Sequence, residues 1–502
     1  MSTAPPVLLI NPTITSHRHA SFPLAVMSLS AALEGKYAPI IIDGNVDREF
    51  ISSVVRAVAE TSMQAVGISV MGGPQLLSAI AVSKAIRARR PELPIVWGGA
   101  FATVCPDAAL NSAYVDYAVR GQGEDTFVEL LDALAAGTRD PGSIAGLTWR
   151  KGGEIVHNPD RKFSVASLTR ILPYDKLQKP EQYVRNTYLG RRTIGYQAAL
   201  GCRYRCTFCG VATMFRGKTA LPPVERLEQD LRFMRDRFGV DAVQFYDHNF
   251  FDREVDMVPL LEVLAQFQMP WWCYARSDAL VNLSESSWSL VRKSGLRMAY
   301  IGAESPSDWL LHDIRKGTSI DQTLEAVEKC RRHGVIPELS FMLAPPRDPE
   351  GETEKTFDFI RMIKRIHPAT EVMIYIYTPL PRRWDTNSTA ARMTSELRDC
   401  DGNPVVFPQS ADGWAEPQWV DYWCHQDAPW LSARLRRRIV DFTTVLGCRY
   451  PTIMDIRASA WGKSALRALA AWRYRFQRYD RPWELHVSRK LIRQWDPRVM
   501  SL

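Results

Sequence analysis

Short apolar runs alternate with amphipathic stretches along the first third of the chain. Val7–Ile10 and Ala65–Val70 have the length of buried strands, whereas Leu24–Leu33 and Leu76–Arg89 repeat apolar residues at helical spacing. Alternating strands and helices build βαβ units, which assemble into a parallel sheet with helices on both faces. The pattern therefore predicts an α/β N-terminal domain with a doubly wound, Rossmann-like parallel sheet. The expected strands are 7–10, 38–42, 65–70, 95–97 and 114–119, and the expected helices are 24–33, 50–61, 76–89 and 126–135.

A second alternation begins near Thr193 and predicts a partial (β/α)6 TIM-type barrel, with its chemistry on the loops that follow the strands. The expected barrel strands are 193–198, 242–245, 271–274, 298–301, 336–343 and 372–377, and the helices between them are 224–238, 257–266, 285–294, 320–333 and 353–367. The polar stretch before the barrel contains a small hairpin around Lys151–Gly153 and suits a linker. The tail predicts helices at 433–445, 458–479 and 483–494, packed on the barrel as a small domain. We therefore expect four parts: 1–140, 141–190, 191–395 and 396–502.

Composition narrows the class of protein. The apolar runs are strand-sized and shorter than a membrane span, and no secretory signal pattern begins the chain. Six of the nine cysteines are scattered singly, which does not resemble a disulfide framework. These features predict a cytoplasmic globular protein.

The net charge of +8 is concentrated in the tail. From Ser432 onward Lys and Arg outnumber Asp and Glu roughly threefold, with aromatic residues such as Trp461, Trp472 and Trp483 interleaved. Such a segment suits contact with nucleic acid, an anionic membrane surface or an anionic substrate. It equally suits a solvated helical face whose arginine stems cover apolar surface. Because no nucleic-acid-binding motif accompanies it, a nucleic-acid partner is not expected.

Cys202, Cys206 and Cys209 form a C-x3-C-x2-C cluster directly after the first predicted barrel strand. Three thiolates cannot complete a tetrahedral zinc site, and no neighbouring histidine supplies a fourth ligand. They can hold three corners of a [4Fe–4S] cluster and leave the fourth iron open to a substrate. A zinc knuckle that takes a distant ligand is the alternative.

This cluster, with Phe208 before its last cysteine, resembles the radical S-adenosylmethionine (SAM) superfamily. Four further segments resemble the ends of that family's barrel strands: Tyr246–Phe250, Cys273–Asp278, Gly302–Ser305 and Thr378–Pro381. The resemblance implies that the open iron binds SAM and that an electron from the cluster cleaves it to a 5′-deoxyadenosyl radical. It also places Phe208 near the adenine, Arg276 at the SAM carboxylate and Glu304 at its amino or ribose groups. A structural salt bridge is the other interpretation of Arg276 and of Glu304.

The N-terminal domain resembles that of the cobalamin-binding subgroup of this superfamily. Gly67–Ser69, Trp97–Thr103 and Arg120–Phe127 match the subgroup's turns against the corrin. The residues expected to contact cobalamin are Ser69, Gly98, Gly99, Gly121, Gly123 and Glu124. Glycine suits these turns because a backbone must approach a flat, bulky ligand closely. The cobalt-ligating D-x-H-x-x-G motif is absent around His17 and His19, so no histidine of this domain is expected to ligate cobalt. A domain that binds nothing and only caps the barrel is the alternative.

With both cofactors, the resemblance implies methyl transfer to an unactivated carbon of a small-molecule or lipid-like substrate, with electrons from a donor such as flavodoxin or ferredoxin. The chain is similar to the group that contains the anaerobic magnesium-protoporphyrin ester cyclase and the hopanoid methylases, so radical cyclisation of a tetrapyrrole-like substrate is the second hypothesis. Modification of tRNA is a remote third, because it usually needs more cysteines near the N-terminus than Cys105. We expect the basic tail to determine substrate specificity. His248, at the end of the second barrel strand, is interpreted as a hydrogen-bonded polar residue rather than a proton carrier.

Overall fold

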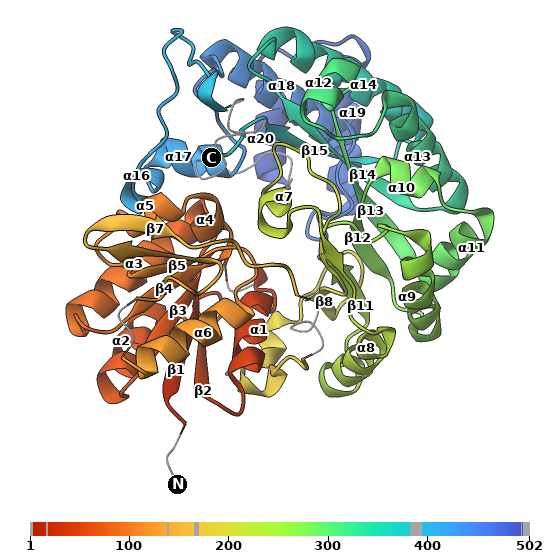
Figure 1. Cartoon of the computed structure of the whole chain (residues 1–502). Helices are drawn as coiled ribbons and strands as arrows, with labels where there is room; N and C mark the ends of the chain where they lie inside the picture. The colour runs from red at the N-terminus through yellow and green to blue at the C-terminus, as the bar shows by residue number, and fades with distance from the viewer. Residues whose placement is uncertain are drawn as a thin grey trace.

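The computed structural model describes residues 4–16, 19–137, 140–164, 170–381, 394–492 and 494. Its first domain is a seven-stranded sheet in the order β2-β1-β3-β4-β5-β6-β7. The first five strands are parallel and helices cover both faces, which confirms the predicted Rossmann-like fold (Figure 1). The strands are β1 (Pro6–Asn11), β2 (Ala38–Asp43), β3 (Ala65–Ser69), β4 (Ile95–Gly98) and β5 (Tyr117–Val119), and the helices are α1 (Leu24–Leu33), α2 (Phe50–Glu60), α3 (Pro74–Arg89) and α6 (Glu124–Ala135).

Two features of this domain differ from the sequence prediction. Two short helices, α4 (Gly99–Val104) and α5 (Pro106–Leu110), fill the stretch after β4 for which no element was expected. The hairpin assigned to the linker forms β6 (Leu147–Lys151) and β7 (Glu154–His157), and β6 pairs antiparallel with β5. Its inward residues, such as Leu147 and Trp149, are buried against the sheet. The sheet therefore extends past residue 141, where the linker was expected to begin. Two short 3-10 turns, Tyr174–Lys176 and Pro180–Tyr183, precede the barrel.

The second domain is a six-stranded parallel sheet in the order β15-β14-β13-β12-β11-β8. This order confirms the predicted partial barrel, since each strand pairs with the next one along the chain. The strands are β8 (Thr193–Tyr196), β11 (Ala242–Phe245), β12 (Trp271–Ala275), β13 (Leu296–Glu304), β14 (Ile336–Leu343) and β15 (Glu371–Ile376). The helices are α8 (Val224–Phe238), α9 (Glu254–Phe267), α10 (Ser277–Val281), α11 (Glu285–Ser294), α12 (Asp308–Asp313), α13 (Ile320–His333) and α14 (Pro349–Ile366). Ser319 and Gln322 form a capping box at the start of α13, which explains its sharp N-terminus.

The C-terminal part contains α16 (Ala411–Trp414), α17 (Pro417–Trp423), α18 (Ala433–Arg449), α19 (Ala460–Arg475) and α20 (Trp483–Leu491). The last three helices pack on the barrel side, as predicted. Residues 394–430, here called the closing segment, instead bridge both domains (Figure 1). The Trp423 ring lies over Gly72 after β3, and the backbone N–H of Ile376 in β15 donates to the His425 carbonyl at 2.8 Å. No helix in the described ranges is long and apolar enough to cross a membrane.

Candidate active site between the two domains

The three cysteines lie on a loop that several backbone contacts hold in place. The loop leaves β9 (Leu200–Gly201), which pairs with β10 (Thr219–Ala220), and ends where Cys209 caps helix α7 (Gly210–Phe215). The Cys209 N–H donates to the Cys206 carbonyl at 3.2 Å, and the Thr207 N–H donates to Ile314 at 2.9 Å. The loop is thus anchored to the barrel before any ligand binds.

Two residues at the end of β11 fix the start of this loop. The buried Asp247 carboxylate accepts the N–H groups of Ala198 and Ala199 at 3.0 and 2.6 Å. The Nδ1 atom of His248 accepts the Gly201 N–H at 3.2 Å, and burial lowers the His248 pKa to about 4. His248 is therefore neutral at pH 7 and acts as a hydrogen-bonded support, in agreement with the sequence interpretation.

The donor set suits an iron–sulfur cluster better than a single ion. Among the described residues, no three His, Cys, Asp or Glu side chains are grouped closely enough to hold one metal ion. A four-iron cube takes one thiolate per iron, so its ligands stand farther apart. Burial raises the pKa of Cys202 to about 11 and also raises that of Cys209, so the thiolates need positive charge beside them. The iron of a bound cluster would supply it, and the Arg276 Nη1 atom lies 3.9 Å from the Cys206 sulfur.

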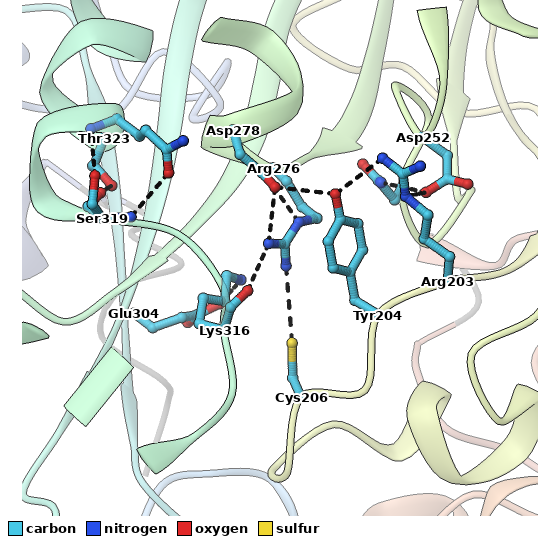
Figure 2. A network of polar contacts seen from close by, with 12 residues as sticks. Arg203, Tyr204, Cys206, Asp252, Arg276, Asp278, Glu304, Lys316, Ser319 and Thr323 are labelled. Atoms are coloured by element: carbon cyan, nitrogen blue, oxygen red, sulfur yellow. Dashed lines mark hydrogen bonds and ion pairs between the residues drawn. The ribbon is translucent and has the colours of Figure 1, made fainter. Parts of the chain in front are cut away.

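Arg276 is held in a network that Figure 2 shows from close by. Its Nε and Nη2 atoms donate to both carboxylate oxygens of Asp278, at 2.9 and 3.2 Å, and Nη2 also donates to the Lys316 carbonyl at 2.6 Å. The guanidinium lies 3.5 Å from the centre of the Tyr204 ring, and the Tyr204 hydroxyl donates to Asp278. Arg276 therefore joins the cysteine loop to β12 and to the segment after α12. These contacts agree with the salt-bridge interpretation, and a contact between Arg276 and SAM stays a prediction.

Glu304 forms a buried ion pair with Lys316, whose Nζ lies 2.6 Å from Oε1. The backbone at Glu304 has a φ of 61° and the pairing register of β13 with β14 shifts there, so a bulge turns this side chain toward Lys316. Gly302 leaves room for the pair, because a Cβ at that position would lie 2.2 Å from the Glu304 carboxylate. The Phe208 ring centre is 6.0 Å from the Lys316 ammonium. Phe208, Glu304 and Lys316 therefore gather beside the cysteine loop at the barrel mouth.

A cavity of about 580 Å³ lies between the carboxyl edge of the first sheet and the start of the barrel. All six residues predicted to contact cobalamin line it: Ser69, Gly98, Gly99, Gly121, Gly123 and Glu124. The opposite wall includes Gly210, Val211, Met214 and Phe215 of α7, the helix that Cys209 begins. The glycine turns thus line one side of the cavity, and α7, which directly follows the cysteine loop, lines the other.

The cavity wall is shaped to admit a broad ligand close to the backbone. Gly99 has a φ of 86°, and a Cβ there would lie 2.8 Å from the Val70 carbonyl oxygen. Thr103 joins two of the turns, since its hydroxyl donates to the Gly99 carbonyl at 2.7 Å and accepts the Gly121 N–H at 2.9 Å. These glycine-rich, largely apolar walls fit a corrin ring. Of the described histidines of this domain, neither His19 nor His157 lines the cavity, and His17 lies outside the described residues.

An ion-pair chain connects the two walls. Arg216, directly after α7, binds Asp160 at 2.5 Å, and Asp160 also binds the buried Arg120 at 3.1 Å. Arg120 precedes the Gly121 turn, so the cluster helix and the glycine turn are linked electrostatically. The sequence motif marked Arg120, but nothing local in the sequence indicated Asp160 as its partner.

The structure also adds residues that the sequence analysis missed. Tyr274, Tyr300 and Tyr375 stay partly exposed on the inner side of otherwise buried barrel strands, and the Tyr300 hydroxyl lies 3.2 Å from that of Tyr375. His425 of the closing segment lies beside them, with its ring centre 6.1 Å from that of Tyr375. Its Nδ1 contacts the Thr378 hydroxyl. The alternation of inward residues could have identified the tyrosines, but only the fold brings His425 to them.

Family models match both domains in this order. Residues 12–131 match the B12 binding domain, and residues 196–360 match the radical SAM superfamily. Together with the cysteine loop and the glycine-lined cavity, these matches identify the chain as a cobalamin-binding radical SAM enzyme. Its cofactors are a [4Fe–4S] cluster, SAM and cobalamin.

Similar proteins agree with this architecture. An uncharacterized methyltransferase of Pyrococcus horikoshii is 25% identical over 370 residues, which cover 72% of this chain and 78% of that protein. The anaerobic magnesium-protoporphyrin IX monomethyl ester cyclase of Synechocystis is 23% identical, over 60% of this chain and 58% of that protein. The hopanoid C-3 methylase of Methylococcus capsulatus is 27% identical, over 66% and 61%.

Among solved structures, the radical SAM methyltransferase TsrM from Kitasatospora setae, with cobalamin and a [4Fe–4S] cluster bound, has a TM-score of 0.66. The match covers 94% of this chain and all of that one at 18% identity. At this identity the likeness establishes the shared fold.

Proposed function

We propose that this enzyme transfers a methyl group to an unactivated carbon of a small-molecule or lipid-like substrate. The observation that carries the proposal is that α7 begins at a cluster cysteine and lines the cavity that the glycine turns of the first domain face. This arrangement would bring a hydrogen-abstracting centre and a methyl carrier within reach of one substrate. The methyltransferase and methylase among its relatives support the same reaction class.

When bound, the cluster and SAM supply a radical that removes a hydrogen atom, and cobalamin supplies the methyl group. A substrate C–H bond is replaced by a C–CH3 bond. One SAM yields methionine and 5′-deoxyadenosine, and a second yields S-adenosylhomocysteine. The balance needs two electrons per methyl transferred, which a donor such as flavodoxin or ferredoxin would supply.

The protein's own residues bind and orient these groups. The cluster would be held by Cys202, Cys206 and Cys209, and Arg276 would keep their loop in place. Glu304 would accept hydrogen bonds from SAM, while Lys316 fixes the Glu304 carboxylate. Phe208 would cover the adenine. The glycine turns would hold the corrin through shape, since their backbone can approach a flat ligand.

The substrate would enter the barrel beside Tyr274, Tyr300, Tyr375 and His425. These side chains offer hydroxyl groups, one imidazole and aromatic faces. His425 comes from the closing segment, so the C-terminal part of the chain would help to select the substrate. This proposal moves the expected determinant of specificity from the basic tail after Ser432 to the closing segment that precedes it.

Cyclisation is the second candidate, because a cyclase is among the relatives. Analysis of the reaction products distinguishes methyl transfer from cyclisation. The full chain would be reconstituted anaerobically with iron, sulfide and hydroxocobalamin, then incubated with a reductant, a metabolite extract and SAM that carries a deuterated methyl group. Methyl transfer predicts S-adenosylhomocysteine in step with 5′-deoxyadenosine and a deuterium-labelled product. Cyclisation predicts 5′-deoxyadenosine without S-adenosylhomocysteine, and that result would overturn the methyltransferase proposal.

A further inference from the structure

The last two helices each expose an apolar stripe to solvent. On α19 the stripe contains Trp461, Leu469 and Trp472 and continues to Phe476, positions that fall on one side of a helix. On α20 it contains Trp483, Val487 and Leu491, each one helical turn from the next. These seven side chains are between 45% and 79% exposed. Isolated exposed apolar residues are ordinary, but two consecutive helices with such stripes are not.

The same helices already use a different face for packing. Leu466 and Ala470 of α19 and Leu485 of α20 are fully buried. Arg473 of α19 forms a bidentate ion pair with Glu484 of α20, which holds the two helices together. The exposed stripes are therefore additional to the faces that stabilise the fold.

Positive charge surrounds the stripes. From Arg457 to Ile492 the chain has nine arginines and lysines and two acidic residues, Asp480 and Glu484. Both acids already face arginines, since Asp480 pairs with Arg438 and Glu484 with Arg473. Arg467, Arg475, Arg478 and Lys490 form no ion pair with any described residue. This part of the surface therefore combines exposed indole rings with cations that no described acid compensates.

We propose that α19 and α20 dock the enzyme on an anionic membrane surface. Tryptophan side chains favour the level of the lipid headgroups, where the ring is buried and its N–H stays hydrated. Arginine and lysine beside them attract anionic phosphates, so one bilayer surface satisfies both features. The helices would lie in the interface and not span it, which agrees with the absence of a spanning helix among the described residues. The proposal does not depend on which reaction the enzyme catalyses.

Flotation of the purified full chain with vesicles tests the proposal. One set of vesicles contains phosphatidylcholine alone, and the other contains equal parts phosphatidylcholine and phosphatidylglycerol. We expect the protein to float with the anionic vesicles and to stay largely free of the neutral ones. Raising the salt concentration should weaken binding, because it screens exposed charges.

Two sets of substitutions separate the apolar and the charged contributions. The triple variant Trp461→Ala, Trp472→Ala and Trp483→Ala should lose most vesicle binding at any salt concentration. Replacing Arg467, Arg475 and Lys490 by Gln should lower partitioning into anionic vesicles by about fivefold per charge removed. The matched controls are Val255→Ala and Arg232→Gln, which alter an exposed apolar residue and an exposed arginine on α9 and α8. Both controls should bind like the unmodified chain.

Circular dichroism and the yield of 5′-deoxyadenosine establish that each variant is folded, since none of these residues belongs to the candidate active site. Two outcomes would overturn the proposal. One is equal flotation of the tryptophan variant and the unmodified chain. The other is no binding to anionic vesicles at low salt, together with a concentration-dependent dimer that the tryptophan variant abolishes, because the stripes would then join two copies of the chain.

Discussion

At the sheet edge of the first domain, glycines and apolar side chains line the candidate cobalamin cavity, whereas at the barrel mouth charged side chains pair with one another. Gly98, Gly99 and Gly121 leave space and expose backbone. Arg276 and Glu304 instead hold fixed partners within 3 Å. The first wall selects by shape and is damaged by an added carbon atom. The second wall holds its side chains in place through ion pairs. Removing one partner of a buried ion pair leaves the other charge unpaired, which lowers stability by about 3–5 kcal/mol.

The largest effect should come from substitution of the three cysteines, whose loop lies at the barrel mouth beside Arg276 and Glu304. Replacing Cys202, Cys206 or Cys209 by Ala should abolish the visible absorption of the cluster and all 5′-deoxyadenosine formation, because three thiolates are needed to hold the cube. Absorption spectra and mass spectrometry of SAM products measure both. Cys400→Ala, at an exposed position in the closing segment, is the control and should behave like the unmodified chain. A variant of the cluster cysteines that still cleaves SAM would contradict the site.

A substitution at Gly98 tests the wall that is shaped by glycine. Its backbone φ of −130° suits any residue, and the nearest atom to a Cβ there is 3.9 Å away, so Gly98→Val should fold normally. Val96 points the same way and lines the cavity, so the added side chain should project into it. We expect cobalamin to bind at least about tenfold more weakly, a cost of about 1.4 kcal/mol, while the cluster forms normally.

Titration of the protein with hydroxocobalamin measures this affinity. Ala38→Val makes a similar change on the exposed edge strand β2, away from the cavity, and should leave the affinity unchanged. Unchanged affinity in Gly98→Val as well would mean that the corrin does not lie against this wall.

The two walls also differ in how much of each the sequence could predict. The glycine turns and the cysteine loop are local patterns. The predicted residues of the turns line one cavity, and α7, which begins at Cys209, forms part of its opposite wall. Helices with strong amphipathic periodicity, such as 224–238 and 320–333, have the predicted bounds. The charged contacts could not be predicted, since the partners of Glu304 and Cys206 lie 12 and 70 residues away.

Contacts between residues far apart in the sequence also explain where the predicted fold differs from the structure. The local pattern of residues 147–157 predicts a hairpin within a linker, because that pattern does not show that the hairpin pairs with β5. The helices α4 and α5 are each six residues or fewer, too short to give a periodic signal. The closing segment contacts the turn after β3 and strand β15, which its own sequence does not indicate.

Variants of Glu304 and Arg276 distinguish a cofactor contact from a support for the loop. Glu304→Gln should weaken SAM binding by about tenfold or more, because a charged hydrogen-bond acceptor is worth about 1.5–3 kcal/mol. Arg276→Lys keeps the charge but loses the bidentate contact with Asp278, so iron content should fall while SAM affinity per cluster stays the same. Anaerobic calorimetry and iron analysis measure the two quantities. An equal loss of SAM affinity per cluster in both variants would assign Arg276 to the cofactor as well.

A smaller effect is expected where the closing segment meets the first domain. A Cβ at Gly72 would lie 1.9 Å from the Trp423 ring, so Gly72→Ala should lower the free energy of unfolding by about 1–3 kcal/mol. The thermal midpoint at a fixed scan rate should fall by a few degrees. In a Trp423→Ala background the same substitution should cost little, since the clash is gone. An equal cost in both backgrounds would show that the strain does not arise at this contact.

The smallest effect concerns His425, which joins the closing segment to the barrel at Tyr375 and Thr378. Burial lowers its pKa to about 4, below the ordinary value of 6.5, so the folded protein favours the neutral ring. Its contribution to stability is therefore complete above pH 6.5 and is lost as the pH falls toward 4. His425→Gln should remove this dependence, because glutamine can still bond to Thr378 but does not titrate. Since His248 titrates in the same range in both proteins, the difference between their melting curves isolates His425. Parallel curves from pH 7 to pH 4 would mean that His425 is solvated and free to charge, and the closing segment would then be a looser wall of the barrel than its contacts with Thr378 and Ile376 indicate.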